Sequence, residues 1–297
     1  MARIFVIFTL ILSAASLTWA QQPNNTPPPP NNGQPANNIN ALVNHQIFLA
    51  YSEDGLHWRT DNQLIRDSSS VPALFYWQDA LWILAVNGTA DENFEKLVML
   101  HQQADGTWQE WFIDLPFEGR PVDPDVVVLP DGKIRLYFFD FSVNSPPQQA
   151  DPSRVGRMYS ATSEDGITFI MEEGVRLESM PPATDPDVIQ QSEVWWMFVS
   201  HPQEGDMIIA QSEDGLTFTE VGAVTHGSIA DTVLLEDGTL RQYACVIRGS
   251  MAIMESTNGL NWIARTDIQP PPGCDPDAVQ LPDGSWVMVY KTMRMDR

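Results

Sequence analysis

Basic residues are scarce in this sequence, and their scarcity excludes several functions. The chain has 297 residues, with 16 Lys and Arg against 39 Asp and Glu, and its net charge is −23. An acidic surface repels nucleic-acid phosphates and anionic lipid headgroups, so we expect neither as a partner. His101, His201 and His226 lack metal-ligand spacing, so a zinc site is not indicated.

Cysteine is also scarce, since only Cys245 and Cys274 occur. In an oxidising compartment the two could pair as a disulfide. The alternative is two buried thiols, and the geometry of their loops decides between them.

The N-terminal residues predict export. Residues 1–20 place Arg3 ahead of an apolar segment and end in small residues before Gln21, which is typical of a cleaved secretory signal peptide. An uncleaved membrane anchor is the alternative, but the apolar segment is at the short end for a span. Residues 21–43 are rich in Pro, Asn and Gln and predict a disordered linker. We therefore expect a secreted or periplasmic protein with no membrane insertion after cleavage. We expect it to be a monomer whose folded domain covers residues 44–297.

A short motif recurs along the folded region. Its copies are YSEDGLHW (51–58), TSEDGITF (162–169), QSEDGLTF (211–218) and ESTNGLNW (255–262), and a weaker fifth copy is QQADGTWQEW (102–111). Asp-Gly or Asn-Gly between alternating apolar runs is a strong hairpin signal, because glycine takes positive φ without a steric penalty. We interpret the motif as a turn that joins two strands. A ligand site at this turn is the less favoured interpretation.

A second motif begins the other half of each sequence repeat, which we call a period. Its copies start near Val71, Asp123, Asp185, Asp231 and Asp275, and each is followed by a turn and another apolar strand. Each period therefore contains four short strands, and five periods fit the chain. This pattern predicts an all-β fold, a five-bladed β-propeller of four-stranded antiparallel blades. The region opens with the last two strands of a unit and ends with the first two, so both ends of the chain should share one blade.

The second motif should form the innermost strands, with proline at the first strand position, where no ladder donor is needed. The residues after the prolines then align as one ring, and the aspartates before the prolines align as a second, incomplete ring. In the first blade Val71 and Ala73 take these places. So many carboxylates around one channel should raise some pKa values or hold a cation, and Ca²⁺ is the candidate. The first ring consists of Asp125, Asp187, Asp231 and Asp277, and the second of Asp123, Asp185 and Asp275.

Five blades with Asp-Pro on their inner strands resemble the glycosidase clan of arabinanases, xylosidases and fructosidases. That resemblance implies three carboxylates on successive inner strands: a basic Asp before a proline, a pKa-modulating Asp and an acidic Glu. This sequence departs from the family pattern in two respects: the first blade lacks the Asp, and no inner strand begins with Glu. Glu118, Glu178 and Glu204 are the rim glutamates that could supply the acid. The Ser-x-Asp-Gly turns are similar to the Asp-box of sialidases, but no arginine cluster for a sugar carboxylate is visible.

The first hypothesis is therefore a secreted glycosidase-like enzyme that acts on an extracellular carbohydrate. Its candidate catalytic residues are Asp123, Asp125, Asp185 and Asp187. The alternative is a non-catalytic propeller that binds carbohydrate or a cation. A third possibility is structural, because an aspartate that recurs in four of five blades can accept hydrogen bonds from strand amides. Asp231, Asp275, Asp277, Glu118, Glu178 and Glu204 are the candidate ligand-binding residues.

Three insertions are expected to surround the site, because they join the second and third strands of neighbouring blades. These are residues 87–96, 140–156 and 201–206. We expect 140–156 to wall one side of a cleft, and a simple surface excursion is the alternative. The tryptophans at 58, 195, 196, 262 and 286 fall at positions that predict packing between blades.

Overall fold

The computed structural model describes residues 41–144, 154–201, 205–246 and 250–294. The predicted signal peptide and residues 21–40 of the predicted linker lie outside this part of the chain. Within the described residues, two short 3₁₀ helices, η1 (Leu42–Asn44) and η2 (Phe141–Asn144), accompany 21 strands, and no α-helix occurs. No helix among these residues is long and apolar enough to cross a membrane.

The strands form five antiparallel sheets, and we number them as blades I to V. Blade I contains β3 (Ser69–Trp77), β4 (Ala80–Asn87), β5 (Leu97–Gln102) and β6 (Trp108–Phe112). Blade II contains β7 (Pro121–Val128), β8 (Ile134–Asp140), β9 (Gly156–Ser163) and β10 (Ile170–Met171), and β11 (Leu177–Ser179) also pairs with β9. Blade III contains β12 (Thr184–Gln191), β13 (Val194–His201), β14 (Asp206–Ser212) and β15 (Thr219–Val224). Blade IV contains β16 (Ser228–Leu234), β17 (Leu240–Val246), β18 (Ser250–Ser256) and β19 (Ile263–Ala264).

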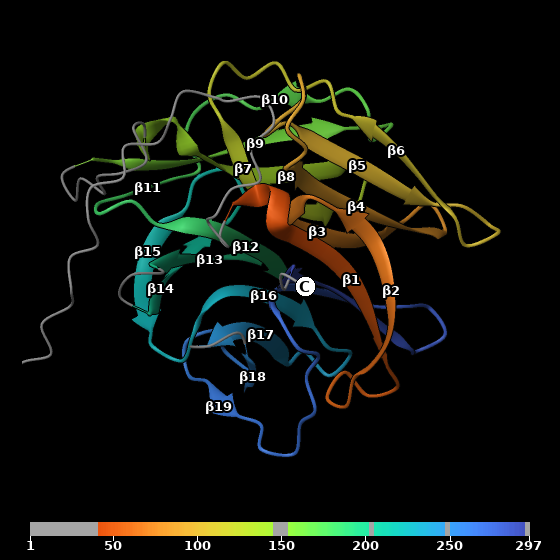
Figure 1. Cartoon of the computed structure of the whole chain (residues 1–297). Helices are drawn as coiled ribbons and strands as arrows, with labels where there is room; N and C mark the ends of the chain where they lie inside the picture. Colours follow the sequence, from red (N-terminus) through yellow and green to blue (C-terminus); the bar gives the residue numbers. More distant parts are fainter. Residues whose placement is uncertain (1–40, 145–153, 202–204, 247–249, 295–297) are drawn as a thin grey trace, which may run out of the picture. The chain divides into compact units, whose positions relative to one another are not determined.

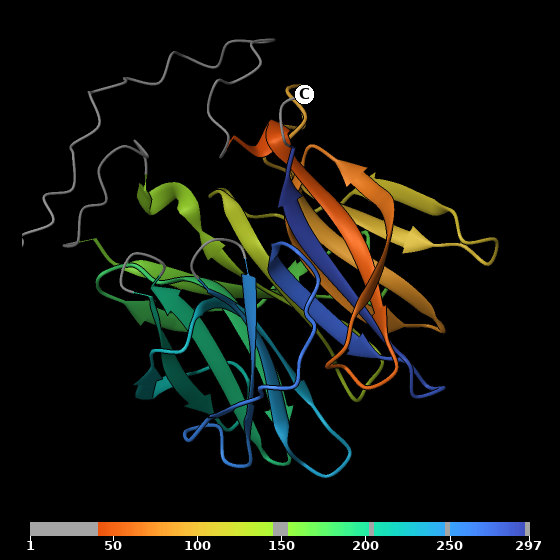
Figure 2. The ribbon, with the colours of Figure 1, turned by 60° about the horizontal axis from the view of Figure 1, so that its bottom comes forward.

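Blade V is built from both ends of the folded region. The C-terminal strands β20 (Cys274–Gln280) and β21 (Trp286–Met293) are its inner two strands, and the N-terminal strands β1 (His45–Ser52) and β2 (Arg59–Asp67) are its outer two, in the order β20-β21-β1-β2. β1 and β21 pair without interruption from His45–Met293 to Ser52–Trp286. Figure 2 shows the blue β21 lying beside the orange-red β1. The predicted closure of the ring is confirmed.

The inner strands of the five blades contact one another in sequence around a ring. β3 contacts β7, β7 contacts β12, β12 contacts β16, β16 contacts β20, and β20 returns to β3. Figure 1 shows the blades arranged around this set of strands. The five-bladed propeller predicted from the repeat is therefore confirmed.

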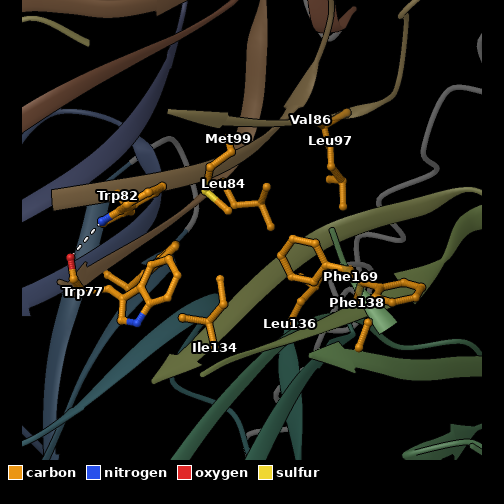
Figure 3. Packing of buried hydrophobic residues seen from close by; sticks show 12 residues of the cluster. Trp77, Trp82, Leu84, Val86, Leu97, Met99, Ile134, Leu136, Phe138 and Phe169 are labelled. Atoms are coloured by element: carbon orange, nitrogen blue, oxygen red, sulfur yellow. Dashed lines mark hydrogen bonds between the residues drawn. The ribbon is translucent and has the colours of Figure 1, made fainter. Parts of the chain in front are cut away.

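The core lies between neighbouring blades. Between blades I and II, Leu84 and Met99 pack in one cluster with Ile134, Leu136 and Phe138 (Figure 3). The indole of Trp82 donates a 2.8 Å hydrogen bond to the carbonyl of Trp77, so its polar atom is satisfied inside the cluster. Of the tryptophans predicted to pack between blades, Trp58, Trp195, Trp196 and Trp286 are at most 6% exposed, and Trp262 is partly buried.

The Ser-x-Asp-Gly turns join the third and fourth strands of a blade, and they also contact the preceding blade. In three of the four clear copies the serine hydroxyl accepts a hydrogen bond from the glycine amide, and in the fourth Ser256 accepts one from the Asn258 amide. In all four, the Asp or Asn side chain accepts two hydrogen bonds from the amides that follow the glycine. The carbonyl of Gly215 accepts a 2.8 Å hydrogen bond from the hydroxyl of Tyr137 in the neighbouring blade. The weaker copy around Gly106 occupies the same place in blade I and closes as a tight hairpin, with Gly106 N–H bonded to the Gln103 carbonyl.

Gly215→Ala tests whether these turns also hold blades together. Gly215 has φ +72°, and an added Cβ would lie 2.8 Å from Arg135 Nη1 and 2.9 Å from Tyr137 Oη. Gly106 has φ +83° and no atom within 4 Å of an added Cβ. Gly106→Ala should cost about 1–2 kcal/mol from the left-handed backbone alone. Gly215→Ala should cost about 1–3 kcal/mol more, from the collision. Urea unfolding measures both, and equal losses would show that the turn does not pack against the preceding blade.

Candidate functional site

Every inner strand has a β-bulge near its start. The pairing of each inner strand with its neighbour shifts register at this point. Five residues at equivalent places in the blades take a left-handed backbone with φ between 44° and 51°: Val71, Asp123, Asp185, Ile229 and Asp275. We call them the pre-proline ring, although in blade IV the following residue is Ala230. The proline was expected at the first strand position, and this is wrong, because β7 begins at Pro121 and Pro124 lies within the bulge.

The residues that follow the prolines form a second set, the post-proline ring: Ala73, Asp125, Asp187, Asp231 and Asp277. Its carboxylates bridge neighbouring blades. Asp125 accepts a 3.0 Å hydrogen bond from the Val188 amide, and Asp231 accepts one of 2.8 Å from the Ala278 amide. Because each donor follows the ring residue of the next blade, the same bond repeats around the axis.

The other two aspartates of the post-proline ring complete this pattern. Asp187 accepts hydrogen bonds from the amide of Thr232 at 3.1 Å and from its hydroxyl at 2.5 Å. Asp277 accepts a hydrogen bond from the Leu74 amide. Blade I carries Ala73 and therefore offers no carboxylate to the next blade. Aspartates that accept hydrogen bonds from inner-strand amides are what the structural hypothesis for these residues predicted.

The pre-proline ring has a different environment. Its three aspartates line a hollow at the end of the channel where the inner strands start, and the hollow has a volume of about 370 Å³, open solvent included. One inter-blade bond is present among them, a 3.4 Å contact from the Asp185 amide to Asp123 Oδ2. All lining residues belong to β3, β7, β12, β16 and β20. Asp125, Asp231 and Asp277 also reach the hollow, whereas Asp187 is not among its lining residues.

Burial is the main cause of the shifted pKa values in this region. Burial, together with the charges of Asp185 and Asp275, raises the pKa of Asp123 well above its usual range. Burial and the charge of Asp275 raise the pKa of Asp185 to about 6, although Thr184 and Lys291 oppose the shift. In the post-proline ring, burial raises the pKa of Asp187 to about 7. Burial, followed by a neighbouring aspartate, raises the pKa of Asp125, Asp231 and Asp277 well above the usual range.

Lys291 is a site residue that the sequence analysis missed. Its Nζ lies 2.5 Å from Asp275 Oδ2, and the two side chains are 13% and 4% exposed. Asp275 Oδ1 is buried and has no hydrogen-bond partner within the described residues. Lys291 pairs with Cys274 in the strand register, so the signal lay in the β20–β21 hairpin.

His45 is a second buried group beside this pair. It is 6% exposed, and its Nδ1 lies 2.8 Å from the Ser70 hydroxyl. Burial and the nearby Lys291 lower the pKa of His45 to about 4, with Asp275 opposing the shift. The imidazole is therefore neutral near neutral pH, and it adds no charge to the site.

Cys245 and Cys274 form a disulfide, which decides between the two alternatives left open by the sequence. The bond links β17 of blade IV to β20 of blade V. Cys245 Sγ also accepts a 3.1 Å hydrogen bond from the Asp275 amide. The disulfide therefore helps to fix the start of the strand that carries Asp275.

The candidate rim glutamates do not line the hollow where they are described. Glu118 is exposed. Glu178 lies on β11 and pairs with Arg157 at 2.8 Å. Glu204 lies outside the described residues. Of the three insertions expected to flank the site, 87–96 is described throughout, and its Glu95 pairs with Arg120 at 2.6 Å, whereas 145–153 and 202–204 fall outside the described part.

A Ca²⁺ ion does not fit the hollow well. Ca²⁺ takes six to eight oxygen ligands, but an ammonium already occupies the place beside Asp275 Oδ2. The carboxylates of Asp125, Asp231 and Asp277 accept amide hydrogen bonds from neighbouring blades. Cys245, Cys274 and Asp275 lie close together, but the two sulfur atoms are bonded to each other and are not thiolate ligands.

No family model and no curated protein matches this sequence. Solved structures match it in fold. A thermostable family-43 glycoside hydrolase is 11% identical with a TM-score of 0.58, over 78% of this chain and 89% of its own. A protein of unknown function from Dyadobacter fermentans is 16% identical with a TM-score of 0.57, over 82% of this chain and 84% of its own.

An exo-β-1,3-galactanase from Phanerochaete chrysosporium, solved with β-1,3-galactotriose, is 11% identical with a TM-score of 0.55. The match covers 83% of this chain and 64% of the galactanase, so the chain spans less than two thirds of that protein. The fold is that of glycosidase propellers. At these identities the likeness concerns the fold alone, and it confirms the resemblance inferred from the Asp-Pro strands.

The raised pKa of Asp187 makes stability depend on pH. Because the folded protein keeps this proton up to about pH 7, whereas an ordinary Asp loses it near 3.8, the free energy of unfolding should fall as the pH rises from about 4 to about 7. Asp187→Asn removes this titrating group. Its free energy of unfolding, measured by urea unfolding, should therefore fall less between pH 5 and pH 8 than that of the wild type. Exposed Asp283→Asn is the control and should decline like the wild type. A decline in Asp187→Asn equal to that of the wild type contradicts the assignment.

Proposed function

We propose that the chain is a secreted glycosidase whose reacting groups are the three aspartates of the pre-proline ring. The observation that carries the proposal is a difference in environment among three carboxyl groups within one hollow. Asp275 pairs with Lys291 through Oδ2 and has Oδ1 unpartnered, while the pKa values of Asp123 and Asp185 are raised. Carboxyl groups whose environments separate their charge states are suited to act as acid and base.

The proposed step is hydrolysis of a glycosidic bond. The proton held by Asp123 and Asp185 goes to the leaving oxygen as the bond from that oxygen to the anomeric carbon breaks. A water molecule supplies the new bond to the anomeric carbon, and its proton passes to Asp275 Oδ1. Transfer of that proton back to the Asp123–Asp185 pair restores the starting state. The proposal departs from the clan pattern, because an aspartate pair takes the role of the acidic glutamate.

Two further observations support a carbohydrate substrate. The galactanase with the same fold was solved with an oligosaccharide, and the aspartates that line the hollow offer acceptors to sugar hydroxyls. The net charge of −23 and the six aspartates that line the hollow disfavour anionic sugars. We therefore propose a neutral glycan, and the pattern of residues 1–20 supports export.

A non-catalytic, carbohydrate-binding propeller is the second candidate. It is favoured by the position of Glu118 and Glu178, which do not line the hollow. Without a glutamate acid, the hollow would still offer carboxylate acceptors to sugar hydroxyls. Binding of a neutral sugar without turnover would support this candidate.

Hydrolysis of neutral aryl glycosides tests the proposal. Purified protein should hydrolyse at least one member of a panel of neutral pyranosides and furanosides. Asp185→Asn and Asp275→Asn should each lower kcat/KM by about 100-fold or more, because each removes a group that transfers a proton. Asp283→Asn, in an exposed hairpin, should retain wild-type activity. An Asp275→Asn variant as active as the wild type would exclude the pre-proline ring as the reacting set, and calorimetry with the corresponding free sugars would then test binding alone.

A further inference from the structure

Lys291 stands among more carboxyl groups than it can neutralise. Its Nζ is 2.5 Å from Asp275 of β20, and the charges of Asp185 on β12 and Asp123 on β7 also act on it. Burial disfavours the ammonium, but these three acids outweigh burial and raise the pKa of Lys291. His45 on β1 faces it as well and is neutral near pH 7. Lys291 is therefore the permanent cation in this group.

One ammonium among three carboxyl groups determines which of them carries a negative charge and which keep a proton. The acid in direct contact, Asp275, gains most from the ammonium, because Coulomb energy falls with distance. Asp123 and Asp185 are joined through the Asp185 amide and repel each other's charge, so the second and third charges are costly. The proton therefore stays with Asp123 and Asp185, which are not in direct contact with Lys291.

A purely structural role explains this arrangement poorly. A buried ion pair gives little net stability over well-packed apolar residues, because both charges lose their hydration. Lys291 comes from the second strand of blade V, behind the strand that carries Asp275. The side chain thus brings its charge to the reacting groups without lining the hollow itself.

We propose that Lys291 is a positioning residue for the pre-proline ring: its ammonium holds Asp275 as a carboxylate with Oδ1 unpaired and leaves the proton on Asp123 and Asp185. The inference rests on the proposed function for its catalytic meaning. The order of charges can be measured without a substrate, so the two ideas can fail separately.

The test is a pH titration of the aspartate side-chain carbons by NMR, on protein labelled with ¹³C at aspartate. Asp185 is assigned by its loss from Asp185→Asn, and in the wild type it should titrate near pH 6. Lys291→Met should raise this midpoint by about one pH unit, because removal of a nearby positive charge disfavours the carboxylate. Lys291→Arg keeps the charge and should stay within about 0.3 unit of the wild type. The Asp275 signal, assigned by its loss from Asp275→Asn, is followed in the same titration. An unchanged Asp185 midpoint in Lys291→Met, with Asp275 still a carboxylate at that pH, overturns the proposal, whereas an Asp275 that has taken up a proton supports it.

A second pair of variants covers the case in which Lys291→Met does not fold, because that change leaves Asp275 buried and unpaired. Asp275→Asn should lower the Asp185 midpoint by removing a repelling charge. Adding Lys291→Met to Asp275→Asn should raise it again by about one unit, and no rise would overturn the proposal. If the wild type hydrolyses glycosides, the pH at which activity is lost should move upward in Lys291→Met. If it hydrolyses none, the proposed enzyme is wrong while the titration still decides the role of Lys291.

Discussion

The hydrogen bond from an inner-strand amide to a carboxylate of the preceding blade is the contact on which the centre of this propeller depends. Asp125, Asp187, Asp231 and Asp277 each accept such a bond. Burial raises the pKa values of all four carboxyl groups above the usual range, so it disfavours their charged forms where these bonds join the blades. The hydrophobic clusters hold neighbouring blades together farther from the axis, whereas these bonds fix the inner strands relative to one another.

The bulge beside each of these bonds creates the candidate site. A left-handed residue before the proline turns a second side chain toward the hollow, so one short motif serves two tasks. Val71 and Ile229 keep this backbone although β-branched residues adopt it rarely. The strain is therefore common to all five blades, and the bulge belongs to the architecture. The proposed chemistry depends on which blades carry an aspartate there. In blades II, III and V these aspartates interact with one lysine, Lys291.

The sequence predicted the fold because its signals are local and repeated: Asp-Gly between apolar runs, and Asp-Pro before them. The two rings also followed from alignment of the repeats. Other features needed the strand register. Pro124 lies within a bulge, Lys291 reaches Asp275 only because it pairs with Cys274, and Glu178 lies on β11 in contact with Arg157. Such contacts join positions that are not equivalent in the repeat, so no recurring sequence motif predicts them.

The most direct test of the central contact is the free energy of unfolding of Asp231→Ala and Asp231→Asn at pH 7. Asparagine keeps a carbonyl oxygen for the Ala278 amide, whereas alanine leaves that amide buried without an acceptor. Asp231→Ala should be less stable than Asp231→Asn by about 1–3 kcal/mol. Equal stability of the two variants would contradict the view that carboxyl–amide bonds join the inner strands.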